Sequence, residues 1–504
     1  MTPVPTHQAA TPQAPAPPVT ASPPPAAPGG VPVPASAPAA PPAFPPRAGR
    51  LSRRLQSVPG RVLVITTAAV VALALLFGAL SSSFQSVRDG LDVIGHDAGP
   101  QVVATADLYF ALSDMDTQVA NVLLIGDEHG LGKGRQRALD VYEQRRSDAG
   151  RAVLQASALA GADPAERRTV RAVLDGLGRY ERLAARAMLL DEQARHRAGP
   201  PPQRVLEIYR QATDLMRLEL LPMAYNLTLE SGTIVRRAHE GQSSAVRLGQ
   251  VLVAGAGLLA LGGLLWLQIF LARRFRRVFN PALVVATVIA GMYTLTGFTV
   301  LGNETGILLE AKRDGFDSVL TLARARAVGN SMHGDQSRYL LDPERADTYE
   351  QTYLDKSQAV LFAPSGNLGA YYKAVAAGVD DYPGRQPFLG LVGQESARSG
   401  LPGHEAAVVE VLRRYEEFQR ADRTMRGLGP RQAVEQRVDA LEQRFGDYDA
   451  ALVELAGLHR TAFDRAVRGG EEQVEELWFL LPLAVISTAV LIVAGVWPRL
   501  SEYR

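Results

Sequence analysis

Three polar residues on one predicted helix, Asn330, Ser337 and Arg338, are the first candidates for binding chemistry in this sequence of 504 residues. Asn330 and Ser337 fall on the heptad seam of that helix, a position that apolar residues usually occupy. The guanidinium of Arg338, their neighbour, could hold a carboxylate through two parallel hydrogen bonds. These residues predict either a polar ligand pocket or a structural polar layer between helices.

A second group of candidate binding residues lies on an earlier helix, at Tyr109, Ser113, Asp114 and Asp116. The serine and the two aspartates fall beside the apolar seam of this helix and not on it. Two interpretations remain open for them. They form either a contact surface for a ligand or partner protein, or a solvated helix face without a binding role.

Charged residues near the apolar segments form a third group, for which we predict a role in signal relay. Glu230 and Arg237 occupy seam positions of a long helix. Polar seam residues either mark a helix layer that moves or, alternatively, are solvated where a bundle opens. A short connector between two apolar runs could present such a movement to a cytoplasmic partner through its arginines: Arg273, Arg274, Arg276 and Arg277.

The sequence contains no recognised catalytic or metal-binding pattern. The eight histidines include no His-x-x-x-His pair, no Gly-x-Ser-x-Gly elbow occurs, and cysteine is absent. His459, on a helix seam, is interpreted as a hydrogen-bonded core residue and not as a metal ligand or pH sensor. We therefore expect no enzymatic activity, no cofactor and no metal. The 53 Lys+Arg and 52 Asp+Glu residues nearly balance, which also argues against a nucleic-acid binder.

Four apolar runs are each long enough to cross a membrane as a helix. Arginines lie before the first run, between the second and third, and after the last. The positive-inside rule therefore predicts that both chain ends and the connector are cytoplasmic. The runs carry no charged side chains, which argues against a transport path. We predict a multi-pass protein of the cell membrane with the spans 61–81, 248–271, 281–301 and 477–497.

The segments between the spans, 82–247 and 302–476, are predicted to lie outside the cytoplasm. Their apolar residues repeat at alternating intervals of three and four, which is typical of helices in a bundle. We predict an all-α fold with two extracytoplasmic antiparallel helical bundles in tandem, the first of them with four helices. Proline and glycine breaks at 362–403 predict an inserted loop region far from the membrane.

The remaining segments are short or low in complexity. Residues 1–60 are rich in proline and alanine and lack apolar periodicity, so we predict a disordered cytoplasmic tail. Residues 272–280 form the arginine-rich cytoplasmic connector, and residues 498–504 form a short cytoplasmic tail.

One stretch of the first bundle resembles a known family. Residues 108–126, LYFALSDMDTQVANVLLIG, together with the two bundles and four crossings, look like the actinobacterial membrane component encoded with a glutamine-binding lipoprotein and a soluble G-type serine/threonine kinase. The resemblance implies that a solute-binding lipoprotein senses amino acids such as glutamate and aspartate. It further implies that the membrane protein relays the occupancy of the lipoprotein to the cytoplasmic kinase.

Taken together, these features predict a membrane sensor or relay without enzymatic activity. Its expected partners are a solute-binding lipoprotein, a cytoplasmic serine/threonine kinase and membrane lipids, whereas nucleic acid is not expected. The sequence leaves open whether the chain forms a homodimer. The alternative is a membrane scaffold that organises envelope machinery and transmits no signal. The polar residues on helix seams favour the sensor, because apolar residues would serve a scaffold better.

Overall fold

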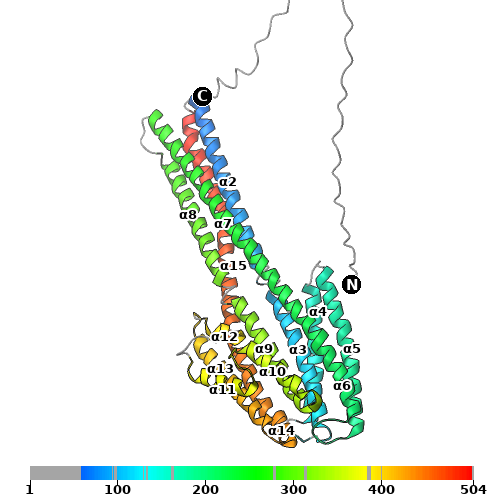
Figure 1. Cartoon of the computed structure of the whole chain (residues 1–504). Helices are drawn as coiled ribbons and strands as arrows, with labels where there is room; N and C mark the ends of the chain where they lie inside the picture. Colours follow the sequence, from blue (N-terminus) through cyan, green and yellow to red (C-terminus); the bar gives the residue numbers. More distant parts are fainter. Residues whose placement is uncertain are drawn as a thin grey trace, which may run out of the picture. The chain divides into compact units, whose positions relative to one another are not determined.

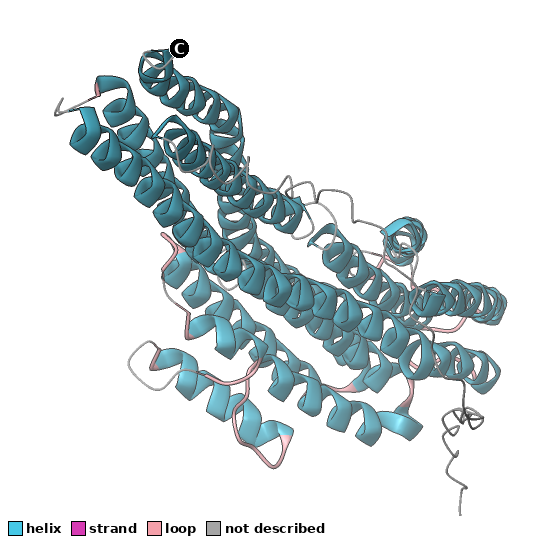
Figure 2. Cartoon of the chain, turned by 90° about the horizontal axis from the view of Figure 1, so that it is seen from above, coloured by secondary structure: helices cyan, strands magenta, loops and turns pink. Residues whose placement is uncertain are grey.

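The described part of the chain is helical. Apart from one isolated bridge between Phe362 and Leu389, its regular elements are all helices (Figure 2), which confirms the all-α prediction. The computed structural model describes residues 58–92, 95, 99–128, 130–131, 134–159, 164–275, 280–310, 315–382, 388–398 and 400–501. The predicted disordered tail lies outside the described residues up to residue 57, and so do Arg276, Arg277 and residues 502–504.

Four helices carry segments long and apolar enough to cross a membrane. They run side by side in Figure 1, where α2 contacts α7 and α15, and α8 contacts the same two helices. Large apolar side chains point away from this group, because Leu258, Trp266 and Phe479 are 71%, 61% and 74% exposed. Such surfaces are unfavourable in water and indicate a membrane protein. The helices are α2 (Val58–Asp92), α7 (Leu221–Phe275), α8 (Pro281–Glu310) and α15 (Glu442–Ser501).

Bundle 1 is built from the chain between the first two apolar segments. Helix α2 ends at Asp92, and the first helix of the bundle begins at Gly99, one residue before Pro100, a residue that is tolerated in the first turn of a helix. The elements are α3 (Gly99–Ile125), α4 (Arg135–Leu159), α5 (Pro164–Ala194), α6 (Gln203–Leu215), the π turn η2 (Met216–Leu220) and the first part of α7.

Bundle 2 follows α8 and contains a helical insertion. Its elements are α9 (Asp317–Leu341), the 3-10 turn η4 (Pro343–Arg345), α10 (Ala346–Val360), α11 (Leu368–Asp380), α12 (Leu391–Ser396), α13 (His404–Arg426), α14 (Pro430–Gln436), the π turn η5 (Arg437–Leu441) and the first part of α15. Local signals set several boundaries. Pro430 is the first residue of α14, and Asn367 caps α11 by accepting a hydrogen bond from the Ala370 amide at 2.9 Å.

The predicted position of the insertion, far from the membrane, is wrong. Arg398, within the insertion, donates a hydrogen bond to Ser318 at the start of α9, and Glu395 lies beside His459 on α15. The antiparallel topology explains this placement. The connection between the second and third long helices of a bundle returns to the end at which the first helix starts. That end is the one nearer the apolar segments.

The last helix of each bundle follows the same plan. A short helix leads into a π turn of five residues, and a long α-helix then continues into an apolar segment. π turns inside helices are rare and often accompany functional sites. The two halves therefore share an arrangement that extends beyond the general bundle architecture.

The two bundles are consecutive in the sequence but pack directly against one another through α3 and α9. A Cβ atom at Gly334 would lie 2.5 Å from the Thr117 hydroxyl, so only glycine permits this close crossing. Apolar residues of bundle 2, including Leu341 and Val438, belong to the same hydrophobic cluster as the core of bundle 1. The bundles therefore share part of one core.

The close crossing predicts that Gly334→Ala destabilises the protein by about 1–3 kcal/mol, because a methyl group there overpacks the interface. Thermal unfolding of the full-length protein in detergent measures this effect. Thr117→Ala should restore part of the loss in a double variant. Gly150→Ala is the matched control, since nothing lies within 4 Å of its added Cβ. Equal destabilisation by both glycine substitutions would contradict the close crossing.

Candidate functional site

The centre of the contact between the bundles is an ion pair between Arg338 on α9 and Asp116 on α3. Both side chains are fully buried, and Arg338 Nη2 donates to Asp116 Oδ2 at 2.7 Å. Thr213 and Tyr180 of bundle 1 also donate to the Asp116 carboxylate, at 2.7 and 3.1 Å. Buried charges persist only when they are paired and hydrogen-bonded in this way. The Arg338 guanidinium therefore holds a carboxylate that belongs to the same chain.

The ion pair extends into bundle 2 through Asp335. Arg338 Nη1 donates to Asp335 at 2.6 Å, and Lys356 on α10 donates to the same carboxylate at 2.5 Å. Burial alone would raise the pKa of Asp335, but the charges of Lys356 and Arg338 outweigh it and lower the pKa below its ordinary value. Burial likewise lowers the pKa of Lys356 to about 8, against the opposing effect of Asp335.

Further polar contacts hold the bundles together around this centre. Ser337 donates to the Asn121 side-chain oxygen at 2.8 Å. Toward the edge, Arg210 makes two hydrogen bonds to the buried Asp342, at 2.8 and 2.6 Å, and Arg345 contacts Asp214 at 3.0 Å. Because the bidentate Arg210 contact fixes orientation as well as distance, it sets the register between α6 and the end of α9.

The polar residues on α3 for which two interpretations were open are buried. Ser113, Asp114 and Asp116 are 0%, 6% and 0% exposed, so the solvated-face alternative is wrong. The reason is tertiary, because bundle 2 covers the face that a single four-helix bundle would leave in water. Tyr109 also faces bundle 2. It is half-buried, and burial raises the pKa of its hydroxyl to about 12.

A pocket of about 220 Å³ opens beside the ion pair, between α3 and α4 of bundle 1 and α9 and α15 of bundle 2. Bundle 1 contributes Asp114, which accepts hydrogen bonds from Arg145 at 2.7 Å and Gln118 at 2.9 Å. Asn121 continues this polar wall, since it donates to Gln118 at 3.3 Å. The wall therefore offers a cation, a carboxylate and two amides from one side of the pocket.

Bundle 2 lines the opposite side of the pocket with His333 and Glu442. The two side chains are 2.8 Å apart, and Arg437 in the π turn η5 contacts the same carboxylate at 3.0 Å. Burial and the charge of Arg437 lower the pKa of His333 below its ordinary value. The pocket thus presents a cation and a carboxylate from bundle 1, and an imidazole and a carboxylate from bundle 2.

Asn330 is the pocket residue whose hydrogen bonding is incomplete. Its side chain is 1% exposed, and within the described residues its amide nitrogen has no hydrogen-bond partner. An unsatisfied buried donor costs roughly 1–3 kcal/mol, so a ligand that accepts this hydrogen bond would gain affinity. Asn330 and Asp114 were separate candidate binding residues, one in each bundle, and both line this pocket.

Of the predicted relay residues, Glu230 and Arg273 have described side chains, and neither lines this pocket. Glu230 on α7 is exposed, which agrees with the alternative that the bundle opens near the membrane. Arg273 is exposed near the end of α7. The side chains of Arg237 and Arg274 are outside the described part of the structure, as are Arg276 and Arg277 entirely.

Sequence reasoning missed several residues that build the site. Arg145, His333 and Glu442 each occupy ordinary positions on amphipathic helices, and no spacing distinguishes them from surface charges. Asn121 lies within the stretch that carries the family resemblance, which is the one signal that could have indicated it. Among the described residues, the group that could hold a metal ion lies outside this pocket, at Glu395, His404 and His459.

The buried ion pair predicts that Arg338→Met lowers the free energy of unfolding by about 3–5 kcal/mol, because two buried carboxylates lose their partner. Chemical unfolding of the full-length protein in detergent measures the loss. Arg413→Met serves as control, since its pair with Glu410 is 46% and 38% exposed and contributes at most about 1 kcal/mol. Similar losses in both variants would show that the interface does not depend on Arg338.

The lowered pKa of His333 predicts a loss of stability in acid. Below about pH 6.5 the unfolded chain binds a proton on this imidazole, whereas the folded chain, with Arg437 beside the ring, resists it. We expect the thermal midpoint to fall between about pH 7 and 5.5, and His333→Gln to remove part of that fall.

His196 provides the matched control for this pH dependence. Burial opposes its protonation, but the hydrogen bond and charge of Asp191 outweigh burial and raise its pKa. His196 therefore stabilises the fold in acid, and this contribution is lost as pH rises through its folded pKa. His196→Gln should make the acid-induced fall larger. A steeper fall in His333→Gln, or no change in either variant, would contradict the assignment.

Comparison with known proteins adds one finding. Residues 90–240 match the family model described as the actinobacterial sensor domain. No curated protein and no solved structure matches the chain. The matched region contains α3 to α6 and the start of α7, and hence Asp116 and the bundle 1 wall of the pocket. The match supports the assignment of this chain as an actinobacterial sensor protein.

Proposed function

We propose that the chain is a four-crossing membrane sensor that responds to extracytoplasmic amino acids through the pocket between its two bundles. The observation that carries this proposal is the shared cavity, in which Asp114 and Arg145 of bundle 1 face Asn330, His333 and Glu442 of bundle 2. A ligand there contacts both bundles at once. The match to a sensor domain over residues 90–240 supports the same role.

The chemistry of the pocket suits a small zwitterion. A free amino acid carries a carboxylate, which Arg145 can receive, and an ammonium group, which the Glu442 carboxylate can receive. The Asn330 amide can donate a further hydrogen bond to a carboxylate or carbonyl oxygen of the ligand. A cavity of about 220 Å³ has the size for one such molecule and not for a peptide chain.

Helix α15 connects the pocket to the proposed membrane segment. Glu442, on the pocket wall, is the first residue of α15, which continues without interruption to Ser501 and includes an apolar segment. The π turn η5 immediately before it contains Arg437, which is hydrogen-bonded to Glu442 at 3.0 Å. We propose that ligand binding changes this contact and shifts α15 against its neighbours by a small rotation or translation.

We further propose that the bundles are extracytoplasmic, that both chain ends are cytoplasmic, and that the signal reaches a cytoplasmic serine/threonine kinase. The arginine distribution around the apolar segments supports this topology. A solute-binding lipoprotein would deliver the amino acid to the pocket or report its own occupancy to bundle 1. The resemblance of residues 108–126 supports both partners.

Ligand binding tests the sensor proposal directly. We expect glutamate, aspartate or glutamine to bind the full-length protein in detergent, as measured by calorimetry. Asn330→Leu should weaken binding at least about tenfold, a loss of about 1.4 kcal/mol. It should leave thermal stability unchanged or higher, because the amide nitrogen makes no described hydrogen bond in the free protein. A polar layer of purely structural importance predicts the opposite, namely lower stability and no ligand.

Two neighbouring arginines of α4 supply a matched pair for the same titration. Arg145→Gln should weaken binding, because Arg145 lines the pocket. Arg146→Gln should not, because this side chain is 47% exposed and pairs with Glu143. Equal effects of the two substitutions would place the ligand elsewhere.

Crosslinking in intact cells tests the partners. The full-length protein is captured through a tag on its proline-rich tail, with and without added amino acids. We expect a solute-binding lipoprotein and a soluble kinase in amounts that depend on the amino acid, and weaker dependence for Asn330→Leu. Recovery of envelope-synthesis proteins alone, unchanged by any solute, would instead favour the scaffold.

A further inference from the structure

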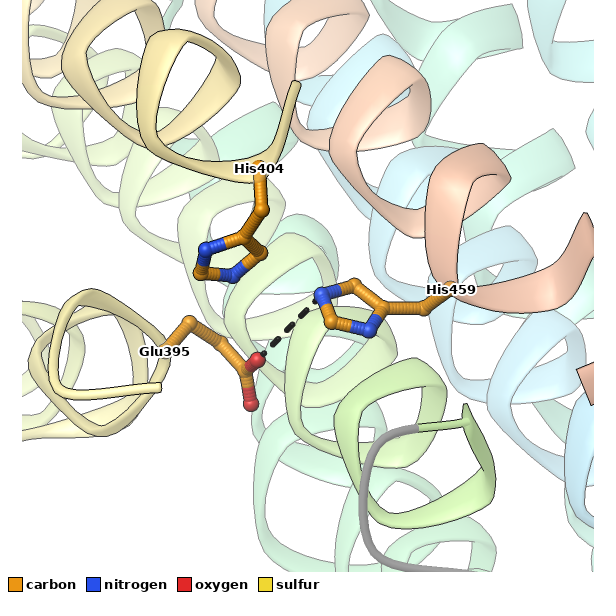
Figure 3. A group of neighbouring side chains, drawn as sticks. All are labelled: Glu395, His404 and His459. Carbon is orange, nitrogen blue, oxygen red and sulfur yellow. Dashed lines mark ion pairs between the residues drawn. The ribbon is translucent and has the colours of Figure 1, made fainter. Parts of the chain in front are cut away.

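Three buried side chains converge in bundle 2, at a place that the proposed sensor function does not use. They are Glu395 on α12, His404 at the start of α13 and His459 on α15, with exposed fractions of 0%, 4% and 2%. Figure 3 shows that all three point toward one common centre from three separate elements. Two imidazoles and one carboxylate are a ligand set that proteins use for zinc.

The separations of the three side chains are compatible with a shared ion. One candidate ligand atom from each residue can be chosen such that all lie within 4.8 Å of one another. His459 Nε2 and Glu395 Oε2 are 3.6 Å apart, which exceeds the usual length of a hydrogen bond. Two ligands of a tetrahedral zinc with bonds of 2.0–2.1 Å lie about 3.4 Å apart.

The orientation of the rings is also suitable. The His404 and His459 rings are nearly perpendicular, at 83°, with centroids 5.1 Å apart. They are therefore not stacked face to face, and each can direct a ring nitrogen to the same point, as Figure 3 shows. A metal ion accepts ligand lone pairs from such separate directions.

The second carboxylate oxygen of Glu395 faces Arg398. Arg398 Nη1 lies 3.2 Å from Glu395 Oε1 and also donates to Ser318 on α9. Oxygen Oε1 is thus ion-paired with the guanidinium, whereas Oε2 faces His459. Carboxylates that bind metals are commonly oriented by polar groups outside the ligand set. The positive charge of Arg398 opposes a bound cation, so the imidazoles must supply much of the affinity.

We propose that Glu395, His404 and His459 bind one divalent transition-metal ion, with zinc preferred. Imidazole nitrogen favours zinc and its first-row neighbours. Calcium and magnesium need six or more oxygen ligands and do not suit this set. The proposal departs from the interpretation of His459 as an ordinary core residue, because Glu395 and His404 reach it only through the insertion.

A metal at this place would fasten the insertion to the helix that enters the membrane. His459 lies about 27 Å along α15 before its predicted span. Glu395 and His404 flank the end of the insertion, which otherwise reaches α9 through Arg398. The ion would join α12 and the start of α13, which are neighbours in the sequence, to α15, which begins only at Glu442. This inference is independent of the amino-acid response, and either can fail without the other.

The metal content of the full-length protein tests the proposal. The protein is purified in detergent without a polyhistidine tag, stripped with a chelator, incubated with zinc or cobalt, and passed through gel filtration. We expect about one ion per chain by mass spectrometry. Cobalt should give the strong visible absorption of a four-coordinate site, and zinc should raise the thermal midpoint.

Variants locate the ion. His404→Gln, His459→Gln and Glu395→Gln should each lower zinc affinity at least about tenfold, as measured by chelator competition. His333→Gln is the matched control, because this imidazole is equally buried but lies beside Glu442. It should keep the full metal content and the zinc-dependent rise of the thermal midpoint.

Two results would overturn the proposal. The first is wild-type protein that retains less than about one tenth of an ion per chain and shows no zinc-dependent thermal shift. The second is equal metal content in wild type and in the His404 and His459 variants, which would indicate adventitious binding elsewhere. If a ligand variant loses its helical circular dichroism, the comparison of wild type with His333→Gln still decides whether a specific stabilising ion binds.

Discussion

The ion pair between Arg338 and Asp116 is the constraint on which the rest of the structure depends. Both groups are fully buried, so each would be strongly unfavourable without the other. Because one lies in each bundle, the bundles cannot separate without exposing the charges to water or leaving them unpaired. Asp335 and Thr213 complete the hydrogen bonding of Arg338. Thr213 belongs to α6, and Asp335 also accepts a hydrogen bond from Lys356 of α10, so both helices take part in the same arrangement. The interface is therefore defined by charge as well as by shape.

This interface also explains why a pocket exists next to it. Side chains that satisfy one another, such as Ser337 with Asn121, close part of the contact. Within the pocket, Asp114 and Glu442 are held by arginines of their own bundles and leave space between them. A ligand in that space would contact both bundles. Glu442 in the bundle 2 wall is the first residue of α15, so the pocket adjoins a helix that continues into an apolar segment.

The fold was largely predictable, and the site only in part. The apolar runs predicted the membrane helices, and heptad spacing predicted helical bundles between them, because both signals are local. Asn330 and Arg338 were identified because a polar residue on or beside a seam departs from the expected pattern. Arg145 and His333 were missed, because their importance comes from a neighbour in the other bundle. The predicted position of the insertion was wrong, because proline and glycine residues indicate where a helix ends but not at which end of the bundle the next segment lies.

The sequence by itself determined the all-α class, the apolar helices and the set of unusual polar residues, since helical periodicity and hydropathy are properties of neighbouring positions. Only the tertiary structure decided that α3 and α9 cross at Gly334 and that Asp116 meets Arg338. It alone also placed Glu395 and His404 against His459. These contacts join residues from separate helices. Their distances depend on how helices pack, which no local pattern in the chain specifies.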